Sequence, residues 1–319
     1  MACPAPLRGH PRAGAGLPAA TARGGVLSAV PDPARARRGL LYGMASEAYH
    51  AHPALGSSTL KRMASASPWH AWKLGLDPAR PVIEPSEAMR AGTLAHCAIL
   101  EPASVTERYV VRPEGLDGRT RDGKLWLNDA RRFGREVITF EQMETAIAQA
   151  RAVREQLPEV ADLLDGAGHS EVSAFWVREA LDPASGEVIE VECKCRPDRV
   201  CEVDARSVVL LDIKTAKDAG AEGFARAIWQ YRYDLQDSWY CEGYETASDV
   251  MVMAMVYVVV ESDYPHAAAA YVLDDEARAL ARGDIDKLVR TYAQCKRANS
   301  WPGYPNTVQS ISLPSWVRR

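Results

Sequence analysis

Three charged side chains lie close together in the middle of the chain: Asp198, Asp212 and Lys214. Asp212 and Lys214 are two residues apart at the end of an apolar run, so on a strand they share one face. Charges on a buried strand are costly unless something binds there. Two neighbouring carboxylates repel each other, and a hard divalent cation such as Mg²⁺ relieves that repulsion. A lysine beside the metal can orient a water and hold a phosphate, which is the equipment of metal-dependent phosphodiester hydrolysis.

Two paired strands would have to position these side chains. The segment 191–213 has the pattern of two strands, broken by a polar turn at 204–206. The half after the turn is continuously apolar, which predicts a central strand, and pairing across the hairpin can bring Asp198 beside Asp212. The alternative is an ordinary salt bridge between Asp212 and Lys214 at a strand end. For an isolated pair of this kind, the salt bridge is the better interpretation.

The flanking sequence reverses that preference. The segments Cys195-Arg-Pro-Asp198, Leu211-Asp-Ile-Lys-Thr215 and 231–240 resemble, in order, the motifs of the PD-(D/E)XK nuclease superfamily. Within it, the chain is most similar to phage recombination exonucleases of the RecE (exonuclease VIII) type. The pattern Gln236-x-x-x-Tyr240 is shared more widely with RecB-like nucleases, which are relatives of the lambda exonuclease type. The resemblance extends from about Tyr49 to the C-terminus.

This resemblance implies an α/β fold with a restriction-endonuclease-like core, in which helices flank a mixed central sheet of about five strands. It also implies a Mg²⁺-dependent deoxyribonuclease, with Mn²⁺ as a second option, that degrades double-stranded DNA from 5′ to 3′ in phage-type homologous recombination. Such enzymes resemble ring-shaped homo-oligomers that pass single strands to an annealing protein. Two alternatives stay open: an endonuclease on the same core, and a non-catalytic DNA-binding module, whose expected mark is a missing acid or lysine.

By the same resemblance, Asp198 and Asp212 bind the metal and Lys214 positions the nucleophilic water. His96 lies on a predicted helix capped by Ser86, where related nucleases place a residue beside the metal, so it is expected to be a ligand or to support one. A lone histidine on a helix is otherwise usually structural. Glycine at position 92, on the same helix, would leave room for the site or for DNA.

Gln236 and Tyr240 are the expected DNA-binding residues. The segment 224–247 is helical in character, and residues four apart on a helix share a face, so both side chains can reach one phosphate or nucleotide. Tyr231 and Tyr244 are expected to extend that face. The alternative is an aromatic stripe that belongs to the core, although a glutamine within it is harder to bury.

Other polar residues near the predicted site are interpreted more plainly. Glu171, at the start of a strand 171–177 expected to open the core sheet, and Glu192 are expected to be solvated rather than to bind metal. Residues 105–135 are polar and arginine-rich and predict an irregular insertion, which could line a DNA channel or be a solvated loop. The thiols with C-x-C-x₅-C spacing are interpreted as apolar strand residues, with an iron–sulfur site as the alternative: Cys193, Cys195 and Cys201.

The composition sets the domain organisation. Residues 1–43 are rich in Ala, Pro, Gly and Arg and predict a disordered extension, so 44–319 is the expected nuclease domain. A short helix from Ser57 is expected to have a hydroxyl cap. Seven cysteines without a secretory apolar segment indicate a cytoplasm, that of a bacterial host cell. No apolar run nears the roughly 20 residues that a membrane helix needs. The net charge of −4 does not exclude local contact with DNA.

Overall fold

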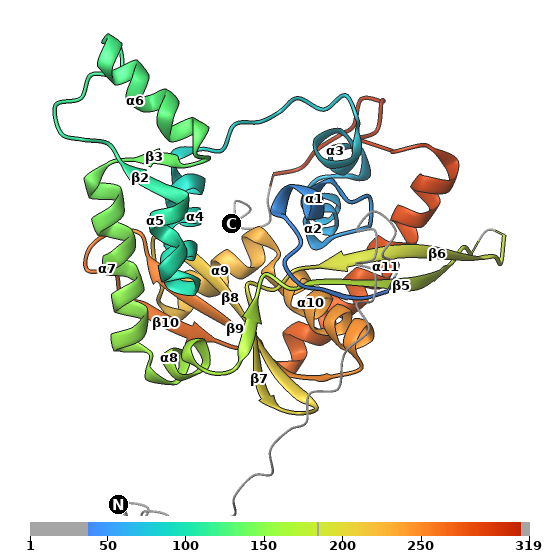
Figure 1. Cartoon of the computed structure of the whole chain (residues 1–319). Coiled ribbons are helices and arrows are strands. Elements are labelled where there is room, and N and C mark those ends of the chain that lie inside the picture. The colour runs from blue at the N-terminus through green and yellow to red at the C-terminus, as the bar shows by residue number, and fades with distance from the viewer. Residues whose placement is uncertain (1–37, 184, 314–319) are drawn as a thin grey trace, which may run out of the picture. The chain divides into compact units, whose positions relative to one another are not determined.

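A computed structural model describes residues 38–183 and 185–313, and its centre is a five-stranded mixed sheet (Figure 1). The strand order is β10-β9-β8-β7-β4, in which only β8 and β9 pair in parallel. Helices flank this sheet, which confirms the predicted fold class. The strands are β4 Gly168–Ser170, β7 Arg199–Asp204, β8 Ser207–Ala216, β9 Met251–Glu261 and β10 Ala268–Tyr271.

The central strand β8 is covered on both faces. Leu210 and Leu211 are neighbours on β8 and both are fully buried, yet they belong to two different hydrophobic clusters. The Leu211 face packs against α4, α7 and α8, while the Leu210 face packs against α9, α10 and α11. Burial on both faces is the reason that this strand is continuously apolar. The helices that form these layers are α4 Glu87–Leu100, α7 Phe140–Gln156, α8 Pro158–Asp165, α9 Ala221–Tyr231, α10 Tyr233–Ser248 and α11 Asp275–Ala298.

A second sheet corrects the prediction that residues 171–177 open the core sheet. These residues begin β5, which lies in a separate three-stranded antiparallel sheet of order β1-β5-β6. Its alternation correctly predicts a strand, but alternation reports which face is buried and carries no information about the partner strand. The chain leaves this sheet at Pro197, which cannot donate to a ladder, and enters the five-stranded sheet at β7. The strands are β1 Gly39–Leu41, β5 Ser173–Leu181 and β6 Val188–Cys195.

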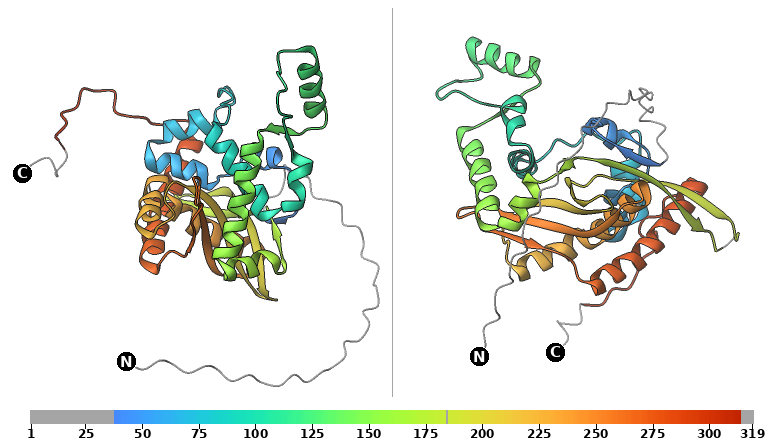
Figure 2. Two further views of the ribbon diagram at one scale, coloured as in Figure 1. Left: turned by 90° about the vertical axis from the view of Figure 1, so that its left-hand side faces the viewer. Right: turned by 60° about the horizontal axis from the view of Figure 1, so that its bottom comes forward.

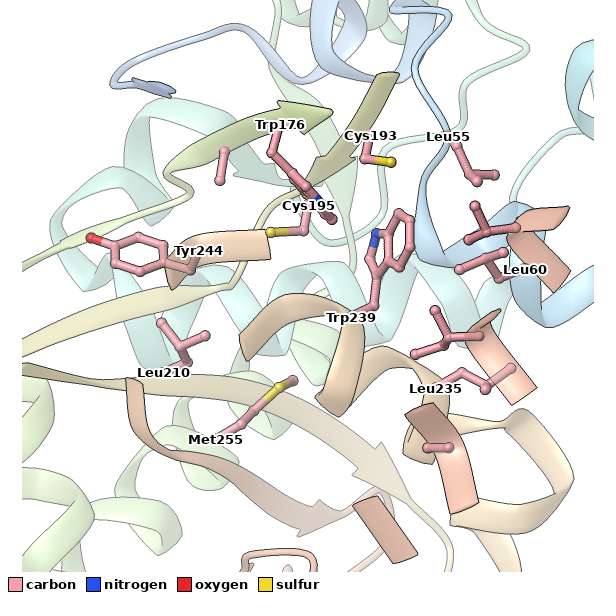
Figure 3. Close-up of a cluster of buried hydrophobic side chains, with 14 of the residues drawn as sticks. Leu55, Leu60, Trp176, Cys193, Cys195, Leu210, Leu235, Trp239, Tyr244 and Met255 are labelled. Carbon is pink, nitrogen blue, oxygen red and sulfur yellow. The ribbon is translucent and has the colours of Figure 1, made fainter. Parts of the chain in front are cut away.

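Helix α10 lies between the two sheets and joins them into one core. It packs against β5 and β6 on one side and β9 on the other. Trp239 of α10 is fully buried, and its ring centroid lies 4.8 Å from that of Trp176 on β5 (Figure 3). The indole N–H of Trp239 donates to the carbonyl oxygen of Lys194, so the buried polar group is satisfied. From this position Gln236 of α10 reaches Asp212 of β8.

The remaining elements are further helices, two helical turns and the two strands of a separate parallel sheet, β2 and β3. Among the described residues, no helix is both long and apolar enough to cross a membrane. The short helix that begins at Ser57 follows Gly56, which has no side chain, and the expected hydroxyl cap is not formed. These elements are α1 Ser46–Ala51, α2 Ser57–Ser65, α3 Pro68–Ala71, a π-helical turn Trp72–Leu76, a 3₁₀ turn Pro102–Ser104, α5 Val105–Arg108, β2 Tyr109–Val111, α6 Arg121–Arg132 and β3 Glu136–Ile138.

Two other expectations need correction. Residues 105–135 are not an irregular insertion, because 121–132 form helix α6, whose N-terminus is capped by the Thr120 hydroxyl. The segment 224–247 is not one helix, because Arg232 adopts a left-handed conformation (φ 52°) that separates α9 from α10. Ion pairs from Arg232 to Asp234 and Asp284 hold this break, which no local pattern signals.

The strand β1 lies within the segment that was expected to be disordered, of which residues 1–37 are outside the described part. It pairs with β5, and Leu40 packs against the main cluster. We expect a chain that begins at Met44 to unfold at lower urea concentration than one that begins at Arg38. The expected loss is about 1–2 kcal/mol, because Leu40 is only partly buried and full burial of a leucine contributes about 1.5–3 kcal/mol. Equal midpoints for the two chains would show that β1 adds no stability.

Candidate active site

The β7–β8 hairpin places Asp198 opposite the residues that follow Leu211. Arg199 pairs with Leu211, so Asp198, which directly precedes β7, faces the segment 212–213. Its Oδ2 accepts a hydrogen bond of 2.7 Å from the backbone N–H of Ile213. The hairpin geometry expected from the sequence is therefore present, with Asp198 just outside the strand rather than on it.

Two side chains from different parts of the chain, His96 and Glu171, converge on Asp198. His96 Nε2 of α4 lies 3.0 Å from Asp198 Oδ2 and 3.8 Å from Glu171 Oε1. Among the described residues, His96, Glu171 and Asp198 could hold a metal ion, because one ligand atom from each lies within 4.8 Å of the others. Carboxylate oxygens are the ligands that Mg²⁺ and Mn²⁺ prefer, so the donor set fits a hard divalent cation.

Glu171 is the residue of this cluster that the sequence interpretation missed. It lies between β4 and β5 in a left-handed conformation (φ 55°), which is rare for a residue with a side chain. Its N–H donates to the carbonyl oxygen of Asp198, and Arg196 Nη1 lies 3.6 Å from Glu171 Oε2. The backbone turn that directs this carboxylate to the site depends on the hydrogen bond to Asp198, which is distant in the sequence. The only local signal for the role of Glu171 is an acid at the start of a predicted strand.

Asp212 is held in a different way from Asp198. It is almost completely buried, and its Oδ1 accepts a hydrogen bond of 2.5 Å from Gln236 Nε2 of α10. Lys214 Nζ contacts Asp212 Oδ2 as an ion pair, although the approach lacks hydrogen-bond geometry. Lys61 of α2 donates to Gln236 Oε1 at 2.8 Å. Because Lys61 donates to the amide oxygen of Gln236 and Asp212 accepts from the amide nitrogen, only one assignment of the two amide atoms fits these contacts.

The positive charges of His96 and Lys214 offset the negative charges of Asp198 and Asp212 without an added ion. Burial lowers the pKa of His96, but the charge and hydrogen bond of Asp198 outweigh it and raise the pKa to about 9. Burial also opposes the charged form of Lys214, yet the charges of Asp212 and Asp198 raise its pKa. Burial raises the pKa of Asp198, and the His96 charge and hydrogen bond more than reverse this. Protonated His96 and Lys214 thus supply the positive charge that a divalent cation would supply.

The expected DNA-binding residues, Gln236 and Tyr240, both face the site from α10. Gln236 is buried and engaged with Asp212, whereas the Tyr240 hydroxyl is hydrogen-bonded to Ser57. Burial raises the pKa of Tyr240 well above its ordinary value. Tyr244 lies in the core, and Tyr231 lies on α9 beyond the helix break, so these two tyrosines do not extend the same face. Contact of Gln236 and Tyr240 with DNA stays a prediction.

A groove of about 890 Å³ opens beside Lys214. Thr215 lies next to it in the groove wall, and a Cβ atom at Gly92 would be 3.3 Å from Thr215 Oγ1. Glycine at this position therefore allows α4 to approach β8 closely beside the site. The other walls are built from α7, α9 and the loop between β8 and α9, and include Gln142, Gln149, Lys217, Arg226, Gln230 and Tyr231.

The remaining candidates lie elsewhere. Cys193 and Cys195 are buried in one hydrophobic cluster and Cys201 in the other, so the three thiols fill the core and do not converge. Burial raises the pKa of Cys195 well above its ordinary value, which disfavours the thiolate that a metal needs. Glu192 lies within β6 opposite Val177 and is not part of the cluster around Asp198.

A mixed sheet that carries an acid before one strand and an Asp-x-Lys sequence on the next, with the lysine in the wall of a groove, is typical of PD-(D/E)XK-like domains. Residues 56–314 match the family described as PDDEXK-like domain of unknown function (DUF3799), and the chain belongs to this family. No curated protein matches the chain significantly.

Comparison with solved structures supports the fold. A presumed exonuclease from Eubacterium rectale has a TM-score of 0.53 and 12% identity, and the match covers 85% of this chain and 96% of that one. At this identity the likeness shows a shared fold only. The protein SSO0001 (TM-score 0.27, 16% identity, 64% and 86% covered) and protein VC1899 from Vibrio cholerae (0.20, 11%, 79% and 60%) are too distant to carry an argument.

Proposed function

We propose that this protein is a metal-dependent nuclease that hydrolyses phosphodiester bonds of DNA. The observation that carries the proposal is the convergence of Asp198, Glu171 and His96 on one side of β8, with Asp212 and Lys214 on the strand itself. An ordinary salt bridge between Asp212 and Lys214 at a strand end would not require Asp198, Glu171 or His96 nearby. Because Asp198, Asp212 and Lys214 are all present, a catalytic domain is favoured over a module that only binds DNA.

Each side chain has a role that follows from its contacts. Asp198, Asp212 and Glu171 would hold Mg²⁺ or Mn²⁺, which when bound activates a water and offsets the charge on the phosphate. His96 donates to Asp198 and fixes the direction of its carboxylate. Lys214 would orient the attacking water and contact the phosphate. Gln236 holds the carboxylate of Asp212 through its hydrogen bond, and Tyr240 would contact the DNA strand beside Gln236.

Within this class we propose a 5′→3′ exonuclease on double-stranded DNA that acts in phage-type recombination. The support is the resemblance to RecE-type exonucleases together with a structural neighbour described as a presumed exonuclease. A homo-oligomer and a single-strand annealing partner belong to the same proposal. Linear duplexes labelled at either end test polarity, and cleavage of closed circular DNA would identify an endonuclease instead.

Lys61 provides a test of the hydrogen-bonded chain that holds Asp212. Replacement of Lys61 by Met should lower the cleavage rate about 10–100-fold, which is the usual cost of removing a group that orients a metal ligand. Lys73→Met, on the adjoining π-helical turn, is the matched control because Lys73 pairs with Asp77 away from the site. A Lys61→Met protein as fast as the control would show that Gln236 needs no second partner.

A further inference from the structure

Helix α6 stands away from both sheets, joined to them through β2 and β3, as Figures 1 and 2 show from three directions. Its attachment is firm, however. A Cβ atom at position 123 would overlap the carbonyl oxygen of Asp117, so only glycine lets the preceding loop pack on the first turn of the helix. The Thr120 hydroxyl caps the same turn. An exposed helix that is rigidly attached is well suited to contact another molecule.

One face of α6 is basic. Four residues with the spacing i, i+3, i+10 and i+11 fall within roughly 100° of one another around the helix axis. All four are exposed, and none forms an ion pair within the described part of the chain. The acids of the helix, Asp122 and Asp129, lie on a different face, so the charges are segregated although the whole chain has a net charge of −4. The basic face consists of Arg121, Lys124, Arg131 and Arg132.

The groove beside Lys214 adjoins a second cavity near this helix. This second cavity, of about 900 Å³, lies at the base of α6 and reaches Arg119, the residue before the helix cap. The two cavities share Thr139 and Glu141 in their walls, so they adjoin at the start of α7. Phe140 lines the second cavity and is 68% exposed, which leaves an aromatic face available beside the junction.

We propose that the basic face of α6 binds the phosphates of a single DNA strand that runs from Lys214 along these two adjoining cavities. The inference rests on the proposed nuclease function and adds the path of the strand. The cavities have the volume of small-molecule pockets and can take a few nucleotides of one strand, but not a duplex. The basic face is roughly 16 Å long, about five nucleotides at 3.4 Å each. An exposed phenylalanine such as Phe140 is the kind of residue on which unpaired bases stack.

The salt dependence of binding tests this proposal. Fluorescence anisotropy of a short labelled single strand would be measured over a range of salt concentrations, with Ca²⁺ in place of Mg²⁺. In the test variant, Arg121, Lys124, Arg131 and Arg132 are all replaced by Gln. Because each phosphate contact contributes about 0.7 to the slope of log affinity against log salt, the slope should become shallower by about 3. The control carries the same charge change on exposed residues elsewhere: Arg151, Arg206, Arg290 and Lys296 to Gln.

An unchanged slope in the α6 variant, or an equal change in the control, would overturn the proposal, and the basic face would then serve another kind of partner such as an acidic protein. If the α6 variant lost affinity for duplex DNA but not for the single strand, this result would also overturn the proposal, because the proposal concerns single-stranded DNA. Melting temperatures establish that each variant is folded. If the wild-type protein shows the α6-dependent slope but cuts no DNA, the nuclease proposal fails and the strand-binding surface stands.

Discussion

Replacement of Asp198 by Asn should reduce DNA cleavage by about 10³-fold or more while the protein stays folded. Asn can still accept the hydrogen bond from the Ile213 N–H, so the hairpin keeps its geometry. It cannot offer a metal the negative charge that His96 and Ile213 now stabilise. A bound metal supplies several kcal/mol of transition-state stabilisation, and each 1.36 kcal/mol corresponds to tenfold in rate.

The control for this substitution lies on the same hairpin. Glu202 of β7 is exposed and does not belong to the cluster around Asp198, so Glu202→Gln removes one carboxylate without touching the site. Mn²⁺ binding followed by electron paramagnetic resonance should be weakened in Asp198→Asn and unchanged in Glu202→Gln. Near-native cleavage by Asp198→Asn would remove this carboxylate from the mechanism.

Lys214→Met should separate chemistry from metal binding. The cleavage rate is expected to fall about 10²–10³-fold, because the ammonium proposed to orient water and to contact the phosphate is lost. Without metal, the variant should also be less stable by about 3–5 kcal/mol, the usual cost of leaving one charge of a buried pair, here that of Asp212, uncompensated. A divalent cation supplies that missing charge, so its addition should raise the melting temperature of the variant more than that of the wild type.

Lys296→Met, on the exposed surface of α11, is the control and should match the wild type in rate and in response to metal. If Lys214→Met cleaves normally, the lysine is only a partner of Asp212. If it loses both cleavage and all metal binding, Lys214 maintains the structure of the metal site rather than the chemistry, and its proposed role would be wrong.

The parts of the site that could be predicted from the sequence are those set by local geometry. Asp198, Asp212 and Lys214 lie on one hairpin, where period-2 alternation and a short turn determine which side chains meet. The position of His96 beside Asp198 could not be predicted in this way, because it depends on the packing of α4 against β8. Its assignment came from the resemblance to known nucleases.

The residues that could not be predicted depend on tertiary structure. Glu171 reaches the site through a left-handed backbone turn, and Lys61 reaches Gln236 from a helix far away in the sequence. Gln236 is expected from the sequence to bind DNA, which stays a prediction, and its hydrogen bond to Asp212 depends on how α10 lies between the sheets. In the same way, alternation predicted the strand 173–181 but not the separate sheet to which it belongs.

The most direct test of the central claim is the incubation of the purified protein with a linear duplex labelled at its 5′ ends, in Mg²⁺ and in EDTA. We expect release of labelled product in Mg²⁺ and none in EDTA, because the ligand atoms of His96, Glu171 and Asp198 lie close enough together to hold a divalent cation. Intact duplex under both conditions, or equal cleavage in both, would contradict a metal-dependent nuclease.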